Sequence, residues 1–249
     1  MRQNKRIPRI STRGFYDLTT GRTKKNKPYE LYPKKFFDNL HDVSEITIMI
    51  HGLRNNKSGA LAKFTIAKHR LGQLGYSHPV IGFSYDSNTS GVQYKSREQR
   101  ATRIGVMIAK KNGKNLAKFI IDTKKKFPNL RIRLIGHSLG SQVIIAALAN
   151  LEGKKLVEAV YIFGASIPAD SVSLSKYGKI IQKTVNEKFV NYFSKKDGVL
   201  KYAYEQNLIP KPIGYCGDSG KSVPKYVQRH VLPKNHRFIS YSQTLTKYP

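Results

Sequence analysis

The stretch GHSLG, residues 136–140, places one serine between two glycines where an apolar run ends and a helical pattern begins. A serine in such a strand–turn–helix setting can act as a nucleophile, because the tight turn holds its Oγ atom outward. Gly136 and Gly140 suit this turn, since larger side chains would collide with the neighbouring strand and helix. The helix N-terminus would also direct the Leu139 N–H at an oxyanion formed beside Ser138. These residues predict acyl-transfer chemistry, and the alternative is an ordinary glycine-rich turn.

Strands and helices that alternate along the chain would position this serine. Short apolar runs predict strands at residues 46–50, 80–85, 132–135, 157–164 and 188–193, with IGYCG at 213–217 as a candidate sixth. Helical periodicity lies between them at residues 60–74 and 101–120, from 140 to 151 and around 171–185. Strands joined by helices of this length predict βαβ units. The expected fold class is therefore α/β, with a mostly parallel, doubly wound sheet covered by helices on both faces.

The chain of 249 residues is long enough for one large domain. Residues 1–44 are rich in Lys and Arg and poor in acids, whereas the strand and helix signals become clear from residue 45 onward. We therefore predict a basic N-terminal extension over 1–44 and an α/β domain over 45–249. The extension is expected either to form a β-hairpin that joins the sheet or to remain an extended arm.

The charge balance is strongly basic, with 45 Lys and Arg against 15 Asp and Glu and a formal net charge of +30. Such a charge should attract polyanions, so association with nucleic acid or an anionic membrane is one expectation. A generally lysine-rich soluble surface is the other. Cys216 is the single cysteine, and neither a secretory leader nor an apolar stretch long enough for a membrane span is evident. We therefore expect a cytoplasmic protein, with peripheral membrane association as the alternative.

Motifs for metals, nucleotides and dinucleotides are missing from the sequence. Neither HExxH nor CxxC occurs, and the acids are too scattered to form a carboxylate cluster. The stretch GDSGKS at residues 217–222 lacks the spacing of a phosphate-binding loop and is interpreted as an ordinary loop. We therefore expect chemistry that uses no metal and no cofactor.

The GHSLG pentapeptide and the order of the predicted elements over 45–249 resemble the α/β-hydrolase superfamily, in the variant common among lipases and esterases. Within it the chain is most similar to poorly characterised branches of serine hydrolases. The resemblance implies a Ser–acid–His triad in that chain order. It places the acid after the second strand beyond the nucleophile strand, and the histidine after the next strand.

The residues that match this triad can be named. Asp197 follows the strand at 188–193 and would orient the histidine, with Asp218 as the competing candidate. His236 lies just before the predicted final helix and would act as general base, whereas His230 is the alternative. Ser138 would be the nucleophile.

The resemblance also assigns the HGL step at residues 51–53, which directly follows the first clear strand. Gly52 would let the backbone approach the substrate carbonyl, and the Leu53 N–H would be the second oxyanion donor beside that of Leu139. His51 is expected to brace this loop, and His137 is expected to support the turn at Ser138.

Two segments at the ends of predicted strands, residues 86–100 and 165–182, are expected to shape a pocket. The second is short, which favours an esterase-like enzyme over a lipase with a large lid. The sequence thus predicts a serine hydrolase of small-molecule or lipid esters with no obligate protein partner. The alternative is a non-catalytic module that binds polyanions through its positive charge.

Overall fold

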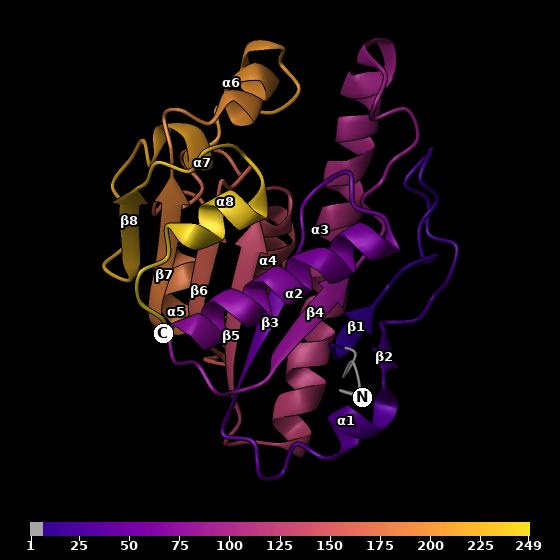
Figure 1. The fold of residues 1–249 in the computed structure, drawn as a ribbon, viewed down its shortest axis with the longest axis vertical. Coiled ribbons are helices and arrows are strands. Elements are labelled where there is room, and N and C mark those ends of the chain that lie inside the picture. The colour runs from indigo at the N-terminus through magenta and orange to yellow at the C-terminus, as the bar shows by residue number, and fades with distance from the viewer. Residues whose placement is uncertain (1–6) are drawn as a thin grey trace.

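Eight strands form one sheet in the order β2-β1-β4-β3-β5-β6-β7-β8, as Figure 1 shows for the computed structural model, which describes residues 7–249. The strands are β1 (Arg9–Ser11), β2 (Glu30–Tyr32), β3 (Glu45–Ile50), β4 (Val80–Ser84), β5 (Arg131–His137), β6 (Val157–Phe163), β7 (Val185–Phe193) and β8 (Tyr226–His230). β1 and β2 pair antiparallel, and every other neighbouring pair is parallel. The predicted α/β class with a mostly parallel sheet is confirmed.

Helices cover both faces of the sheet. α2 (Lys57–Gln73) and α8 (Phe238–Gln243) lie on one face, and α3 (Glu98–Lys126), α4 (Gly140–Asn150) and α5 (Gly178–Thr184) lie on the other (Figure 1). The short elements are α1 (Lys34–Asp38), η1 (Lys95–Arg97), α6 (Gly198–Glu205) and α7 (Ile213–Cys216). Buried side chains of α2 and α8 form one hydrophobic cluster with the sheet, and those of α3, α4 and α5 form the other. α6 lies beyond the carboxyl ends of the strands, where the site described below is located.

The basic N-terminal segment contributes two strands to the sheet, because β1 pairs with both β2 and β4. It also packs on α3. The Thr12 hydroxyl donates to Asn112 Oδ1 at 2.5 Å, and the Tyr29 hydroxyl donates to Asp122 at 2.7 Å. These contacts make residues 9–32 part of the same structural unit as the rest of the sheet.

The candidate sixth strand at residues 213–217 is wrong. Residues Ile213–Cys216 form the short helix α7, which begins directly after Pro212. The final strand is instead β8, whose sequence YVQRH is mostly exposed at the sheet edge. An exposed edge strand needs no apolar run, so the hydrophobic pattern gave no signal for it.

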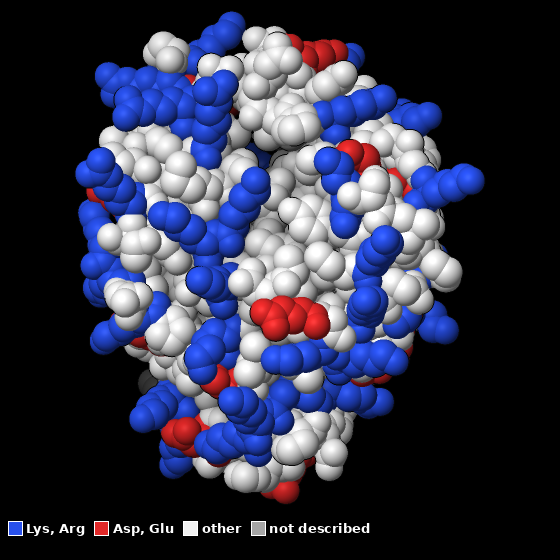
Figure 2. Space-filling model, turned by 180° about the vertical axis from the view of Figure 1, so that it is seen from behind, with Lys and Arg blue, Asp and Glu red and all other residues white. Residues whose placement is uncertain are grey.

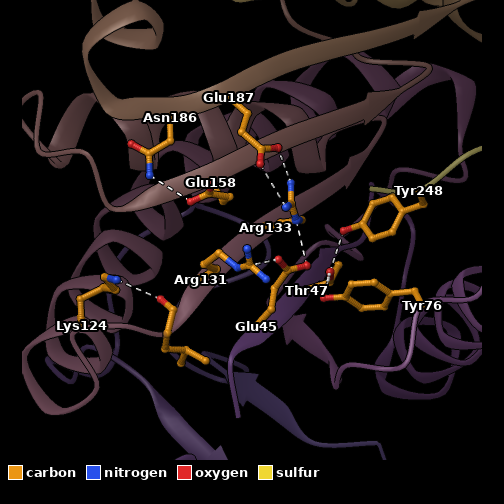
Figure 3. A network of polar contacts seen from close by, with 11 residues as sticks. Glu45, Thr47, Tyr76, Lys124, Arg131, Arg133, Glu158, Asn186, Glu187 and Tyr248 are labelled. Carbon is orange, nitrogen blue, oxygen red and sulfur yellow. Dashed lines mark hydrogen bonds and ion pairs between the residues drawn. The ribbon is translucent and has the colours of Figure 1, made fainter.

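An ion network with a buried centre lies at the amino ends of β3, β5 and β7 (Figure 3), whereas the site described below lies at the carboxyl ends of the strands. The Arg133 guanidinium of β5 donates to Glu45 of β3 at 2.8 Å and to Glu187 of β7 at 2.7 Å. Arg133 and Glu45 are only 3% and 2% exposed, whereas Arg131, which also contacts Glu45, is 51% exposed. Arg133 thus joins β5 to β3 through the buried Glu45 and to β7 through Glu187, so three strands that are far apart in the sequence are linked.

We expect Arg133→Ala to lower the free energy of unfolding by about 3–5 kcal/mol, because it leaves Glu45 charged and buried without its main partner. Arg131→Ala should cost about 1 kcal/mol or less, since it removes only a solvent-exposed ion pair. Urea unfolding monitored by circular dichroism measures both values. Equal losses in the two variants would contradict the importance of the buried pair.

Candidate active site

Ser138 lies in a sharp turn between the end of β5 and the start of α4. Its φ is 52°, a left-handed conformation that costs energy for any residue with a side chain. Its N–H donates to the Phe163 carbonyl at 3.0 Å, which holds the turn against β6. A side chain at Gly136 would lie 2.7 Å from Ile144, and one at Gly140 would collide with the Ile50 carbonyl. The turn is therefore as tight as the sequence predicts.

The loop after β3 lies directly against this turn. A Cβ atom at Gly52 would be 2.9 Å from the Ser138 Cβ and 3.1 Å from the His137 carbonyl oxygen. Only glycine permits this approach of the backbone. Within residues 7–249, neither the Leu53 N–H nor the Leu139 N–H donates a hydrogen bond to another protein atom. Two backbone donors are thus available close to Ser138.

The His51 ring is buried below this loop, where it stacks on the Tyr85 ring at a centroid distance of 4.5 Å. The Tyr85 N–H donates to its Nε2 atom at 3.2 Å, so the proton is on Nδ1, which donates to the Gly52 carbonyl at 3.0 Å. Burial and the nearby Arg13 charge lower the pKa of His51 to about 3. His51 is therefore a neutral brace of the loop.

A residue that the sequence reasoning missed, Arg13, holds the same loop from the N-terminal segment. Its Nη2 donates to the carbonyl oxygens of Asn55 and Asn56 at 3.2 and 3.0 Å, and its Nε donates to the Ser84 hydroxyl at 2.6 Å. In the sequence Arg13 is one of many basic residues around it, and no local pattern distinguishes it. Its role depends on the pairing of β1 with β4, which places the segment beside the loop.

The Asp197 carboxylate and His236 are in direct contact. Asp197 is the N-cap of α6, and its Oδ1 accepts the Leu200 N–H at 3.1 Å. Its Oδ2 accepts from His236 Nδ1 at 2.7 Å and from the Tyr241 hydroxyl at 2.6 Å. Burial opposes ionisation of Asp197, but these hydrogen bonds and the His236 charge outweigh it and lower the pKa. The carboxylate is therefore charged at neutral pH and has three donors.

Tyr241 is a second residue that sequence reasoning missed. It lies on α8 with its ring fully buried, and a Cβ atom at Gly164 would be 2.9 Å from that ring. Gly164, with φ 50°, thus leaves the space that the tyrosine fills. A tyrosine within a short amphipathic helix is normally a core residue, so the sequence carried no signal for a contact with Asp197.

His137, which precedes Ser138, connects the turn to the loop that contains His236. Its Nε2 lies 2.7 Å from the His236 carbonyl oxygen, and a carbonyl can only accept, so the proton is on Nε2. Burial and the nearby His236 lower the pKa of His137 to about 3, which keeps the ring neutral. One hydrogen bond thus holds the loop of His236 to the residue next to Ser138.

Several of the residues described above line a cavity of about 500 Å³. Gly52, Leu53, Ser138, Leu139 and His236 line it. α6 supplies an apolar wall, and the segments 86–100 and 165–182 each contribute a lining residue, Glu98 and Ser166. The Arg54 guanidinium at this cavity forms an ion pair with Glu98 at 2.5 Å, so its charge is neutralised.

The two competing candidates lie elsewhere. Asp218 is in the loop after α7, where its N–H donates to Gln228 Oε1 at 2.6 Å. His230 ends β8, is exposed and packs against Phe193 at a centroid distance of 5.2 Å. Neither lines the cavity with Ser138. Among residues 7–249, no group of three or more His, Cys, Asp or Glu side chains is placed to hold a metal ion.

Because His51 and His137 are buried and neutral, the free energy of unfolding should depend on pH. His51 and His137 have a folded pKa near 3, below the unfolded value of 6.5, so the unfolded chain binds more protons below that value. Their contribution is complete above pH 6.5 and is lost as the pH falls toward 3. We expect the free energy of unfolding to drop by about 4 kcal/mol between pH 7 and pH 5, about 2 per histidine. Urea titrations at both values test this, and a drop under about 1 kcal/mol contradicts it.

Comparisons with known proteins place the chain near uncharacterised relatives. Residues 98–214 match a family described as a protein of unknown function, DUF726. An uncharacterized membrane protein of Schizosaccharomyces pombe is 36% identical over 76 residues, which cover 29% of this chain and 9% of that protein. The chain thus spans less than a tenth of this relative's length. Within the described part of the chain, 7–249, we find no helix with the length and apolar character needed to span a bilayer.

The chain is similar in fold to solved structures. TT1662 from Thermus thermophilus is similar with a TM-score of 0.50 and 14% identity, over 81% of this chain and 85% of that one. A lipase-esterase related protein from Clostridium acetobutylicum has a TM-score of 0.42 and 12% identity, over 82% and 91% of the two chains. At these identities the likeness concerns the fold alone. With its strand order and parallel sheet, the chain has the α/β-hydrolase fold.

Proposed function

We propose that this protein is a serine hydrolase that cleaves carboxylic esters through an acyl-enzyme intermediate. The observation that carries the proposal is the arrangement around one cavity of Ser138, with its φ of 52°, and His236, bonded to Asp197 at 2.7 Å. A strained serine that shares a cavity with a histidine oriented by a buried carboxylate is an arrangement suited to nucleophilic catalysis.

In this mechanism the Ser138 hydroxyl attacks the ester carbonyl while His236 Nε2 takes its proton. The Asp197 carboxylate keeps the other imidazole proton on Nδ1 and stabilises the imidazolium that forms. The imidazolium then gives its proton to the departing alcohol, which leaves an acyl group on Ser138. His236 then takes a proton from water, which attacks this acyl group. As the bond from the carbonyl carbon to Ser138 Oγ breaks, the imidazolium returns the proton to Oγ, so the acid is released and the serine is restored. No cofactor or metal takes part in these steps.

The oxyanion of each tetrahedral intermediate would accept the N–H groups of Leu53 and Leu139. Three observations support this assignment: both residues line the cavity, both N–H groups lack a protein partner within 7–249, and Gly52 contacts the serine turn. Leu139 also lies at the N-terminus of α4, where the helix dipole favours negative charge. Arg13 and His51 would keep the loop in this position.

A fluorophosphonate probe tests the proposal on the folded chain, because it reacts covalently only with an activated serine. We expect stoichiometric labelling, with the adduct mapped by mass spectrometry to the peptide that contains Ser138, and turnover of short p-nitrophenyl esters. Heat-denatured protein is the matched control and should remain unlabelled. Absence of labelling and of turnover in the folded protein contradicts the proposal.

A second candidate function, binding of polyanions without catalysis, rests on the excess of 45 Lys and Arg over 15 Asp and Glu. We propose that this charge instead assists catalysis, by drawing the protein to anionic membranes that carry its substrate. The two roles respond differently to salt. Polyanion binding weakens steeply between 50 and 200 mM salt, because counterions are released on binding, whereas turnover of a neutral soluble ester is nearly constant.

A further inference from the structure

A second cavity of about 510 Å³ adjoins the one that contains Ser138. Ser166, Leu208 and Ile209 line both cavities and form the wall between them. The second cavity lies beside α3 and α4, the helices on the face seen in Figure 2, where Lys and Arg side chains border a hollow. Its floor is apolar, with Val106 of α3 and Ile145 of α4 among the lining residues.

The charges of the two cavities differ. Arg103 and Lys110 line the second cavity, and they lie two turns apart on the same face of α3. No Asp or Glu lines this cavity, and neither cation forms an ion pair or a side-chain hydrogen bond within residues 7–249. In the first cavity, by contrast, Glu98 neutralises Arg54. The second cavity therefore offers two unneutralised cations above an apolar floor.

The wall between the cavities contains a polar atom without a partner. Ser166 is 7% exposed, and its Oγ neither donates nor accepts a hydrogen bond among the described residues. A buried hydroxyl that lacks a partner costs free energy unless a ligand or water satisfies it. Its position between the cavities suits an oxygen atom of a molecule that extends across both of them.

We propose that the second cavity binds a phosphate group carried by the substrate of the first. This inference rests on the proposed ester hydrolysis. The acyl chain would lie along the apolar wall of α6, the carbonyl would face Ser138, and the alcohol portion would pass Ser166. Its phosphate would then bind Arg103 and Lys110, because a guanidinium matches phosphate oxygens bidentately and an ammonium adds a point charge. The substrate class is an amphiphilic ester with a phosphate on its alcohol side.

The test compares two soluble substrates that share one acyl chain, a monoacylglycerol and the corresponding 1-acylglycerol 3-phosphate, below their critical micelle concentrations. We expect the wild type to prefer the phosphate ester in kcat/KM by at least about 10-fold, since hydrogen bonds to charged groups are the stronger ones. Arg103→Ala/Lys110→Ala should remove most of this preference through KM and leave turnover of the monoacylglycerol unchanged.

A matched control separates a specific site from the general positive charge. Lys114→Ala/Lys154→Ala also removes two positive charges, but from exposed positions that line neither cavity. This variant should keep the preference for the phosphate ester. Equal loss in both double variants, or equal kcat/KM for the two esters in the wild type, overturns the phosphate site while ester hydrolysis stands. Hydrolysis of neither ester overturns the proposed function itself.

Inorganic phosphate distinguishes the source of the bound group. If the cavity takes the phosphate of the substrate, millimolar inorganic phosphate should compete with 1-acylglycerol 3-phosphate and leave monoacylglycerol turnover unchanged. Activation or inhibition of monoacylglycerol turnover by inorganic phosphate alone would instead identify a free-phosphate effector site and overturn the assignment to the substrate.

Discussion

Ser138→Ala should lower the kcat of p-nitrophenyl ester hydrolysis by at least about 10⁴-fold and abolish fluorophosphonate labelling. The variant keeps the turn, the proposed oxyanion donors and the His236–Asp197 pair, but it lacks the atom proposed to form the acyl-enzyme. Any residual rate would come from binding and from the oxyanion donors alone. Stopped-flow or steady-state absorbance at the nitrophenolate band measures the rate.

The control for this variant is Ser175→Ala, an exposed serine that lines neither cavity. It should keep the wild-type rate and labelling. Circular dichroism and urea unfolding show whether both variants remain folded. If Ser138→Ala is folded and is still labelled at the wild-type rate, another residue is the nucleophile.

Asp197→Asn should lower kcat by about 10⁴-fold with little change in fold. The amide that replaces the carboxylate can donate to His236 Nδ1, which then carries no proton and leaves Nε2 protonated. In that tautomer His236 cannot accept the Ser138 proton. The lost charge also removes the stabilisation of the imidazolium. Rates measured with the same ester, together with slower fluorophosphonate labelling, report this loss.

Asp218→Asn is the natural control, since Asp218 is the competing acid by sequence and lies outside the cavity. It should hydrolyse esters at the wild-type rate. A large loss in Asp218→Asn with full activity in Asp197→Asn would reverse the assignment of the acid.

Much of the fold could be predicted because its strands are buried. β3, β4, β5, β6 and β7 each contain a buried segment rich in apolar residues, as expected of strands covered on both faces, and their predicted positions agree with the structure to within a few residues. β8 was missed because it is an exposed edge strand, and α7 was mistaken for a strand because four apolar residues carry no periodicity.

The candidate site divides in the same way. The positions of residues just after a strand, such as Ser138, Gly52 and Asp197, can be predicted from the sequence, because each strand places them at the carboxyl edge of the sheet. The roles of Arg13 and Tyr241 cannot be predicted from the sequence, since their contacts depend on tertiary packing between segments that are remote in sequence. The hydrogen bond from His137 to the His236 carbonyl also depends on such packing, although His137 itself is expected from the sequence to support the turn.

The brace from Arg13 makes the proposed activity a measure of how completely the chain has folded. The loop proposed to hold the oxyanion depends on a segment near residue 13, and the proposed general base lies in a loop near residue 236. A partly folded state could contain most of the sheet and still lack either part. During refolding from urea, recovery of hydrolysis should therefore lag behind recovery of far-ultraviolet circular dichroism, so that turnover reports the last docking events rather than the first.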